Sequence, residues 1–363
     1  MGLGRIFFIG AFWQYFLWFW QSQTAKMGAA KETFMTTQSA LCKTHFVDLP
    51  LARLHVLETG EGEPLIMVPA TISELENWRT LAQFMGQWFH VYFFELPGHG
   101  ASDPFDGGFS SHKVAELVGQ LADRMGHQRF NLMGFSFGGI LSMRTFKLLS
   151  HRIDRLILIA PCLGYRALPF SSLRLSLLRR ANHLLGRPGV QNWFVNLIHN
   201  PRTVAWMVKT LQAVGQLEDT IPLQEKLPRT RAGTIAVLNA QVNEILTTDF
   251  EVEPEKFETP CYFAMSVHDP LLQFDVTREI LDRHFANVST VKLSYPFHQP
   301  PAPFTYEELN GDFHETVNAF LQPLVQQGDR HGNSKDNLRR PDRLHGDRSL
   351  DLLGTADRLP ALV

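Results

Sequence analysis

The chain has 363 residues, of which 44% are hydrophobic and 19% charged, and its formal net charge at pH 7 is -2. This is the composition of an ordinary packed protein with one large domain or two modest ones. The charge balance argues against nucleic acid as a partner, because a nucleic-acid-binding protein needs a basic surface. The cysteines, Cys42, Cys162 and Cys261, form neither a C-x-x-C nor a zinc-ligand pattern. Neither a disulfide framework nor a metal site is therefore expected.

The N-terminal segment and linker, residues 1–44, contain an almost wholly apolar run at 6–20 (IFFIGAFWQYFLWFW). The run is short for a bilayer span, which takes about 20 residues. Three interpretations stay open: a shallow membrane-surface anchor, an export-signal core, or sequence upstream of a true start at Met27 or Met35. We expect a cytoplasmic protein, associated with a membrane surface if the first interpretation holds.

From about residue 45 the sequence alternates between short apolar strands and stretches of helical spacing. The expected strands are 45–49, 53–58, 64–68, 90–95, 129–133 and 155–160. The expected helices are 78–88, 111–125 and 138–149. Alternation of this kind is typical of a parallel sheet that helices cover on both faces.

Residues 165–257 interrupt the alternation with leucine-rich helical patterns, such as 171–185 and 191–217, and contain no strong strand. Four arginines make the first pattern basic beside its leucines: Arg174, Arg179, Arg180 and Arg187. Such a face is usually a solvated surface. Together with the N-terminal aromatics, it also permits a role at a membrane surface.

Strand character returns at 261–266 and 289–295, and a helix is expected over 305–326. The simplest arrangement is one sheet domain, built from residues 45–164 and 258–327, with residues 165–257 inserted as a helical cap. Residues 328–363 are polar and rich in Asp, Arg and Gly, so we expect a disordered tail.

The glycine-rich turn at residues 134–139 (GFSFGG) carries the clearest chemical signal in the chain. It lies between the expected strand at 129–133 and the expected helix at 138–149. A serine in such a G-x-S-x-G turn is a nucleophile elbow, whose tight backbone needs small residues two positions before and after the serine. The Ser136 hydroxyl would then stand at the positive end of a helix, which stabilises developing negative charge.

A second motif, at residues 95–103 (ELPGHGASD), is similar to the D-x-P-G-x-G-x-S turn of the α/β-hydrolase family, with Glu95 in place of the usual Asp. With the elbow, it makes residues 45–325 resemble that family. The resemblance implies a mostly parallel, eight-stranded α/β-hydrolase sheet with helices on both faces and a helical cap insertion. This turn is structural in the family, so His99 is expected to have a structural role.

A serine hydroxyl needs an imidazole to take its proton and a carboxylate to orient that imidazole. In the family the chain order is Ser, acid, His. Asp269 in Ser266-Val267-His268-Asp269-Pro270 matches the acid position after the seventh strand, with Ser266 where Gly is common. The other interpretation of Asp269 is a loop-capping aspartate.

His298, just after the expected last strand, matches the position of the family's base, although Phe297 stands where Gly is usual. The main rival is His314, but the helical pattern around it would carry it away from the strand ends. His284 precedes the last strand and is expected at the surface.

The oxyanion hole is where the sequence departs most from the family. Pro69-Ala70-Thr71 replaces the common His-Gly after the third strand. Backbone amides form such a hole, so different side chains can still serve. The expected donors are the N–H groups of Thr71 and Phe137. Proline has no N–H, and Ala70 is the second candidate for the first donor.

These residues imply acyl transfer to water without a metal or organic cofactor. The expected protein is a serine hydrolase of esterase or lipase type, whose substrate is an apolar small-molecule ester or a lipid. A serine at the elbow argues against dehalogenase or epoxide hydrolase chemistry, in which the family uses Asp. Two alternatives stay open: a C–C bond hydrolase or acyltransferase with the same three residues, and a non-catalytic binding protein.

Overall fold

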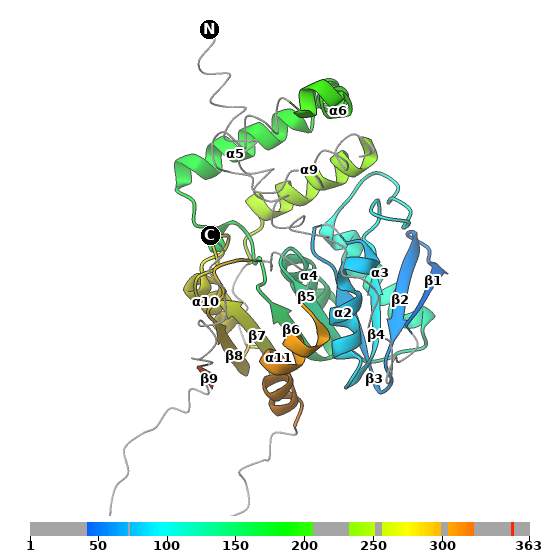
Figure 1. Ribbon diagram of the computed structural model, residues 1–363, viewed down its shortest axis with the longest axis vertical. Helices are drawn as coiled ribbons and strands as arrows, with labels where there is room; N and C mark the ends of the chain where they lie inside the picture. The colour runs from blue at the N-terminus through cyan, green and yellow to red at the C-terminus, as the bar shows by residue number, and fades with distance from the viewer. Residues whose placement is uncertain are drawn as a thin grey trace, which may run out of the picture.

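The structure is a computed structural model of the chain, and it describes residues 42–71, 73–205, 232–250, 256–298, 304–322 and 350–351. One open sheet forms the centre of this part of the chain, with strand order β1-β2-β4-β3-β5-β6-β7-β8-β9 (Figure 1). The N-terminal aromatic run at 6–20 lies outside the described residues. None of the helices that the structure describes is both long and apolar enough to cross a bilayer.

All eight strands expected from the sequence are present, with ends shifted by a few residues. They are β1 (Lys43–Asp48), β2 (Arg53–Thr59), β3 (Glu63–Val68), β4 (Phe89–Phe94), β5 (Phe130–Phe135), β6 (Ile153–Ile159), β7 (Cys261–Ser266) and β8 (Val288–Leu293). The pairs β1–β2 and β2–β4 are antiparallel, and every other pair in the sheet is parallel. The predicted fold class is confirmed.

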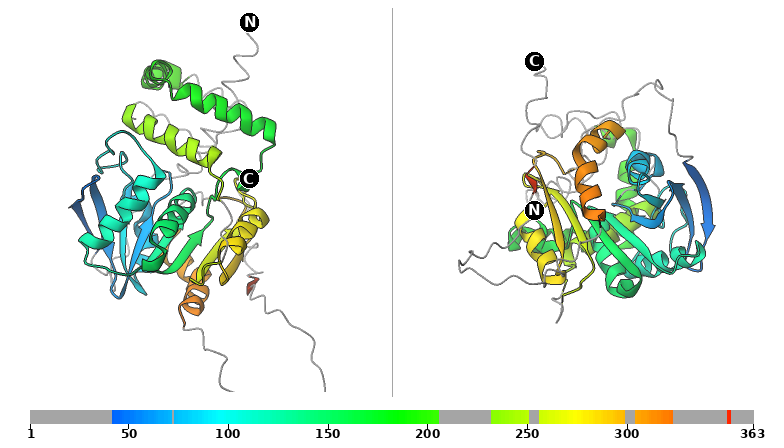
Figure 2. Two further views of the ribbon diagram at one scale, coloured as in Figure 1. Left: turned by 180° about the vertical axis from the view of Figure 1, so that it is seen from behind. Right: turned by 90° about the horizontal axis from the view of Figure 1, so that it is seen from below.

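The sheet has two cores because alternate residues of each strand face opposite sides. In β3, Ile66 and Val68 belong to one apolar cluster, whereas Leu65 and Met67 belong to the other. The first cluster contains side chains from α3 (Ser111–Arg124), α4 (Gly138–Leu149) and α10 (Phe274–His284). The second contains side chains from α2 (Leu75–Met85) and α11 (Tyr306–Leu321). Both faces are thus covered (Figure 2).

Most helix predictions are confirmed, but α2 and α10 differ from them. Helix α2 begins at Leu75 rather than at residue 78, because the buried Glu95 carboxylate accepts a hydrogen bond from the Leu75 N–H at 3.2 Å. Helix α10 was not expected from the sequence. Two 3-10 turns complete this part of the fold, η1 (Ser150–Arg152) and η2 (Tyr165–Ala167).

Between β6 and β7, the described residues form α5 (Ser172–Leu185), α6 (Pro188–His199) and α9 (Ala232–Thr247), and residues 201–205 are helical as well. The helical pattern expected over 191–217 is interrupted at Asn200, the C-cap of α6, because Pro201 follows. Its part beyond residue 205 lies outside the described residues. Figure 1 shows these helices stacked above one end of the strands. Residues 206–231 are outside the described part.

Within the predicted tail, Leu350–Asp351 forms a two-residue strand, β9, that pairs in parallel with β8. The backbone of these two residues lies at one edge of the sheet, and disorder of the tail stays a prediction. The rest of 323–363 lies outside the described residues. The division of the chain into domains stays a prediction.

Candidate active site

Ser136 lies where the sequence predicts an elbow, between β5 and α4, and its backbone is in the left-handed region at φ 52°. Among the described residues, only Ala160 shares a positive φ without being glycine. The serine backbone is held from both sides: its N–H donates to Ile159 O at 3.1 Å, and its carbonyl accepts from Cys162 N at 2.8 Å. The surrounding strands therefore impose a conformation that costs of order 1–3 kcal/mol.

Two glycines of the turn make this conformation possible. A Cβ added to Gly134 would overlap Ser142 Oγ and Gly138 O, and one on Gly138 would lie 2.7 Å from Val68 O. Both positions exclude any larger residue, as the elbow geometry requires.

The structure brings the three predicted side chains together from the ends of β5, β7 and β8. His298 Nε2 lies 2.8 Å from Ser136 Oγ, and His298 Nδ1 lies 2.7 Å from Asp269 Oδ2. The His298 and Asp269 side chains are only 3% and 1% exposed. Such an arrangement can move a proton from the hydroxyl to the imidazole while the carboxylate fixes the ring's orientation.

Asp269 is oriented by the backbone that follows it. Its Oδ1 accepts hydrogen bonds from Leu271 N at 2.8 Å and Leu272 N at 3.0 Å, which leaves Oδ2 to face His298. The carboxylate is thus both the loop cap that the sequence suggested as an alternative and the partner of the imidazole.

Ser266 is a contributor that sequence reasoning missed. Its hydroxyl donates to Tyr295 O and accepts from His268 N, at 3.1 Å in the second case. It therefore ties the loop that carries Asp269 to the loop that carries His298. The only signal in the sequence was a serine where glycine is common in the family.

The rival histidines lie elsewhere. His314 is on α11, where its ring centroid is 5.2 Å from that of Trp88. His284 is buried, with 1% exposure, so the expectation of a surface residue is wrong. Its ring Nδ1 lies 2.8 Å from Ile280 O at the end of α10, and the helix carries the ring inward.

His99 is also buried, and burial lowers its pKa from 6.5 to about 4. Gln241 of α9 donates its side-chain N–H to His99 Nε2 at 3.1 Å. The imidazole thus holds α9 against the turn after β4, which agrees with the structural role expected for it.

One expected oxyanion donor, Phe137, directly follows the serine, and the other, Thr71, belongs to the loop after β3. The loop after β3 lies against the elbow, since a Cβ on Gly138 would be 3.0 Å from Pro69 O. Within the described residues, the N–H groups of Thr71 and Phe137 donate to no backbone carbonyl. The Thr71 hydroxyl is also fully buried, with no hydrogen-bond partner in the same part of the chain.

Two further observations concern the surroundings of the serine. Burial raises the pKa of the nearby Cys162 thiol to about 12, so this thiol stays protonated and does not compete as a nucleophile. Phe135 packs beside the base, with its ring 5.7 Å from that of His298 and 5.1 Å from that of Trp78. No cluster of three potential metal ligands occurs among the residues that the structure describes.

A mostly parallel sheet with a strained serine at the end of β5 is the architecture of an α/β hydrolase. The chain matches the model of the alpha/beta hydrolase family over residues 65–361, and it belongs to that family.

Individual relatives are distant. A pimeloyl-(acyl-carrier protein) methyl ester esterase of Nitrosomonas europaea is 30% identical over 119 residues, 32% of this chain and 45% of that protein. An N-formylmaleamate deformylase of Pseudomonas putida is 29% identical over 122 residues, 32% of this chain and 46% of that protein. The matched part thus spans about half the length of these curated relatives.

A solved structure of a bacterial membrane phospholipase A is similar at a TM-score of 0.54 and 20% sequence identity, covering 88% of this chain and 93% of that one. At this identity the likeness shows the fold alone.

Proposed function

We propose that the protein is a serine hydrolase that cleaves an ester or related acyl bond of an apolar small molecule or a lipid. The observation that carries the proposal is the buried series of contacts from Ser136 Oγ through His298 to Asp269, at 2.8 and 2.7 Å. These are the contacts that activate a serine hydroxyl.

In the proposed reaction, Ser136 Oγ attacks the carbonyl carbon while its proton passes to His298 Nε2. The carbonyl oxygen becomes an oxyanion and accepts hydrogen bonds from Thr71 N and Phe137 N. Collapse of this intermediate leaves an acyl group on the serine, and the leaving alcohol takes the proton from His298. Water, deprotonated by the same nitrogen, then releases the acid. Asp269 keeps Nδ1–H pointed at its own carboxylate throughout.

The apolar substrate class rests on the groups beside the serine. Phe135 places an aromatic ring next to His298, and Trp78 packs against Phe135 in turn. Neither side chain carries a charge that would bind a polar acyl group. The names of the relatives from Nitrosomonas and Pseudomonas denote a methyl ester esterase and a deformylase. Both names are compatible with acyl transfer to water.

The test is a panel of p-nitrophenyl esters of two to sixteen acyl carbons, assayed with the wild type and with Ser136→Ala. We expect hydrolysis by the wild type, faster for longer chains than for acetate, and a loss of at least about 10³-fold in the variant. A folded protein that cleaves no ester, or that cleaves equally well as Ser136→Ala, would overturn the proposal.

We further propose a cytoplasmic protein whose N-terminal segment, residues 6–20, attaches it to a membrane surface. Fractionation of cells that express the tagged full chain tests this localisation. Recovery outside the cell, or processing near residue 26, would contradict it.

A further inference from the structure

Helix α5 has two apolar faces, and only one of them is used in packing. Leu175, Leu178 and Leu185 are buried, at 5–8% exposure. On the opposite side, Leu173, Leu177 and Leu184 are 72%, 42% and 38% exposed. The spacing of these three, at positions i, i+4 and i+11, places them on one stripe of the helix.

Helix α6 continues this surface with Val190 and Trp193, which are 37% and 56% exposed. We call the five side chains the α5–α6 face. Nine large hydrophobic residues are exposed in the described part of the chain, and five of them belong to this 21-residue stretch. The clustering distinguishes the face from the scattered exposed apolar residues of an ordinary surface.

The same region is strongly basic. Residues 155–217 contain eight lysines and arginines and no Asp or Glu, so the rest of the chain, with a total of -2, carries -10. Arg180 lies on the stripe of Leu173, seven residues along, and Arg187 follows α5; both are exposed. Neither makes an ion pair with a carboxylate of the described residues, whereas Arg179 turns inward to donate to Leu246 O.

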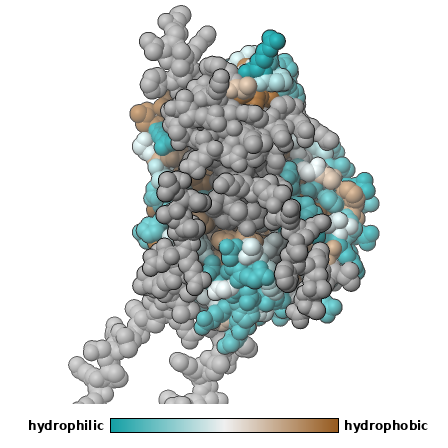
Figure 3. Space-filling view, viewed as in Figure 1, coloured by the Kyte–Doolittle hydropathy of each residue, from teal (hydrophilic) through white to brown (hydrophobic). Residues whose placement is uncertain are grey.

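The face lies on the outside of the molecule. Helix α9 packs on α5 and α6 from below and contacts the turn after β4 through Gln241 and His99. Figures 1 and 2 show α5 and α6 farther from the sheet than α9. In Figure 3, the coloured atoms at the top of the molecule include hydrophobic and hydrophilic surface side by side.

We propose that the α5–α6 face docks on an anionic phospholipid bilayer. Leucines and a tryptophan on one side of a helix, with arginines among and beside them, are what an interfacial helix presents to headgroups and acyl chains. A second copy of the chain is a poorer occupant, because a symmetric pairing of this face would oppose arginine with arginine without any acid to compensate. The proposal is independent of the proposed chemistry.

The test uses full-length protein carrying Ser136→Ala, so that hydrolysis does not alter the lipid. Flotation with vesicles of phosphatidylcholine alone is compared with vesicles containing 30% phosphatidylglycerol, at low and high salt. We expect binding to the mixed vesicles to exceed binding to the neutral ones by at least about 10-fold at low salt, and the preference to disappear at high salt.

Three variants locate the contact. Leu173→Glu with Trp193→Glu should weaken vesicle binding by about 10-fold or more, because two apolar contacts become charged. Arg180→Glu with Arg187→Glu should remove the preference for phosphatidylglycerol. Leu148→Glu is the matched control, since Leu148 on α4 is 50% exposed but outside the face, and should bind as the parent does.

Other results would overturn the proposal. One is unchanged binding in both face variants, with loss only when Trp13, Trp18 and Trp20 of the N-terminal run become serine. Another is a dimer in sedimentation velocity without lipid that Leu173→Glu converts to a monomer. Turnover of a soluble ester by the face variants in the wild-type Ser136 background, with unchanged circular dichroism, shows that folding and chemistry are intact.

Discussion

Two hydrogen-bonded pairs with the same donor–acceptor distance lie at opposite ends of the strands of the sheet. At the carboxyl ends of the strands, His298 and Asp269 are 2.7 Å apart with side chains 3% and 1% exposed. At the amino ends, Arg155 and Glu63 are also 2.7 Å apart, but their side chains are 26% and 60% exposed.

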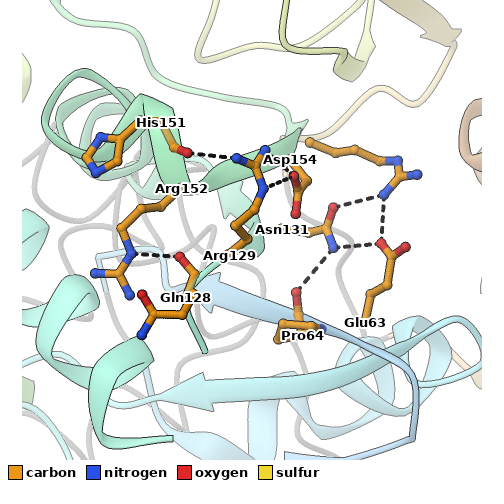
Figure 4. Close-up of polar contacts among 9 residues, drawn as sticks. Glu63, Pro64, Gln128, Arg129, Asn131, His151, Arg152 and Asp154 are labelled. Atoms are coloured by element: carbon orange, nitrogen blue, oxygen red, sulfur yellow. Dashed lines mark hydrogen bonds and ion pairs between the residues drawn. The ribbon is translucent and has the colours of Figure 1, made fainter. Parts of the chain in front are cut away.

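The amino-end contacts form a surface network (Figure 4). Asn131 donates to Glu63 and to Pro64 O, both at 3.2 Å, and Arg129 donates to Asp154 at 2.7 Å. The charged side chains of this network are partly or largely exposed to water, so each ion pair contributes at most about 1 kcal/mol to stability.

The two pairs differ in their exposure to solvent and not in the distance between donor and acceptor. In the buried pair the carboxylate has no water to compete with the imidazole, so the ring is held in one orientation. At the exposed pair, water can replace either partner. The loss of one side chain should therefore have a large effect at the carboxyl ends of the strands and a small one at the amino ends.

The largest effect is expected for His298→Ala, which should lower kcat/KM for a p-nitrophenyl ester by about 10⁴-fold or more. The serine would then have no group to take its proton. His314→Ala is the matched control, because that ring packs on Trp88 instead; its activity should stay within twofold. Equal losses in the two variants would show that the histidine at the strand ends has no special role.

The buried His99 should make stability depend on pH. Its pKa is about 4 in the folded protein against 6.5 for the free side chain, so the unfolded chain binds more protons between these values. The contribution of neutral His99 to the free energy of unfolding should be fully present above pH 6.5. It should decrease by about 3 kcal/mol as the pH drops to 4.

Urea unfolding of the wild type and of His99→Gln over this pH range measures the effect. The variant keeps an acceptor for Gln241 and should lose most of the slope, whereas His112→Gln, at an exposed position, should keep it. Parallel curves for wild type and His99→Gln would contradict the assignment.

Ser266→Ala should lower kcat by about 10²-fold with little change in KM, because the loops of Asp269 and His298 lose their common hydrogen bond and the base is displaced. Ser266→Thr, which keeps the hydroxyl, should restore much of the rate. If threonine and alanine behave alike, packing rather than the hydrogen bond explains the residue. Ser289→Ala, on the exposed side of β8, is the control.

The smallest effect is expected at the amino ends of the strands. Arg155→Ala removes the guanidinium from Glu63 and Asn131, yet the free energy of unfolding should change by less than about 1 kcal/mol. Ester hydrolysis should not change. A loss of several kcal/mol, measured by urea unfolding, would mean that the exposed network is coupled to the core.

Residues with a local sequence pattern could be predicted, whereas residues whose partners are distant in the sequence could not. Ser136, Asp269 and His298 were predicted because a strand end followed by a turn leaves a local pattern, and the family supplies their order. The double role of Ser266 was not predictable, since its partner Tyr295 O is a backbone atom of the separate loop after β8. The burial of His284 was missed for a similar reason: α10, which turns the ring inward, was not expected from the sequence.

The contacts of the inserted helices with the sheet domain could not be predicted from the sequence either. His99 was expected to be structural, but nothing in the sequence pairs it with Gln241, which lies 142 residues further along. Long-range contacts of this kind depend on how α9 is placed over the sheet. The strand pattern predicts the sheet and not the placement of an insertion above it.

The central claim, that Ser136 is an activated nucleophile, is tested most directly by a fluorophosphonate probe and mass spectrometry of the labelled peptide. We expect one adduct, on Ser136, formed rapidly by the wild type and by Arg155→Ala but not by His298→Ala. Folded wild-type protein that stays unlabelled, or an adduct on a different serine, would contradict it.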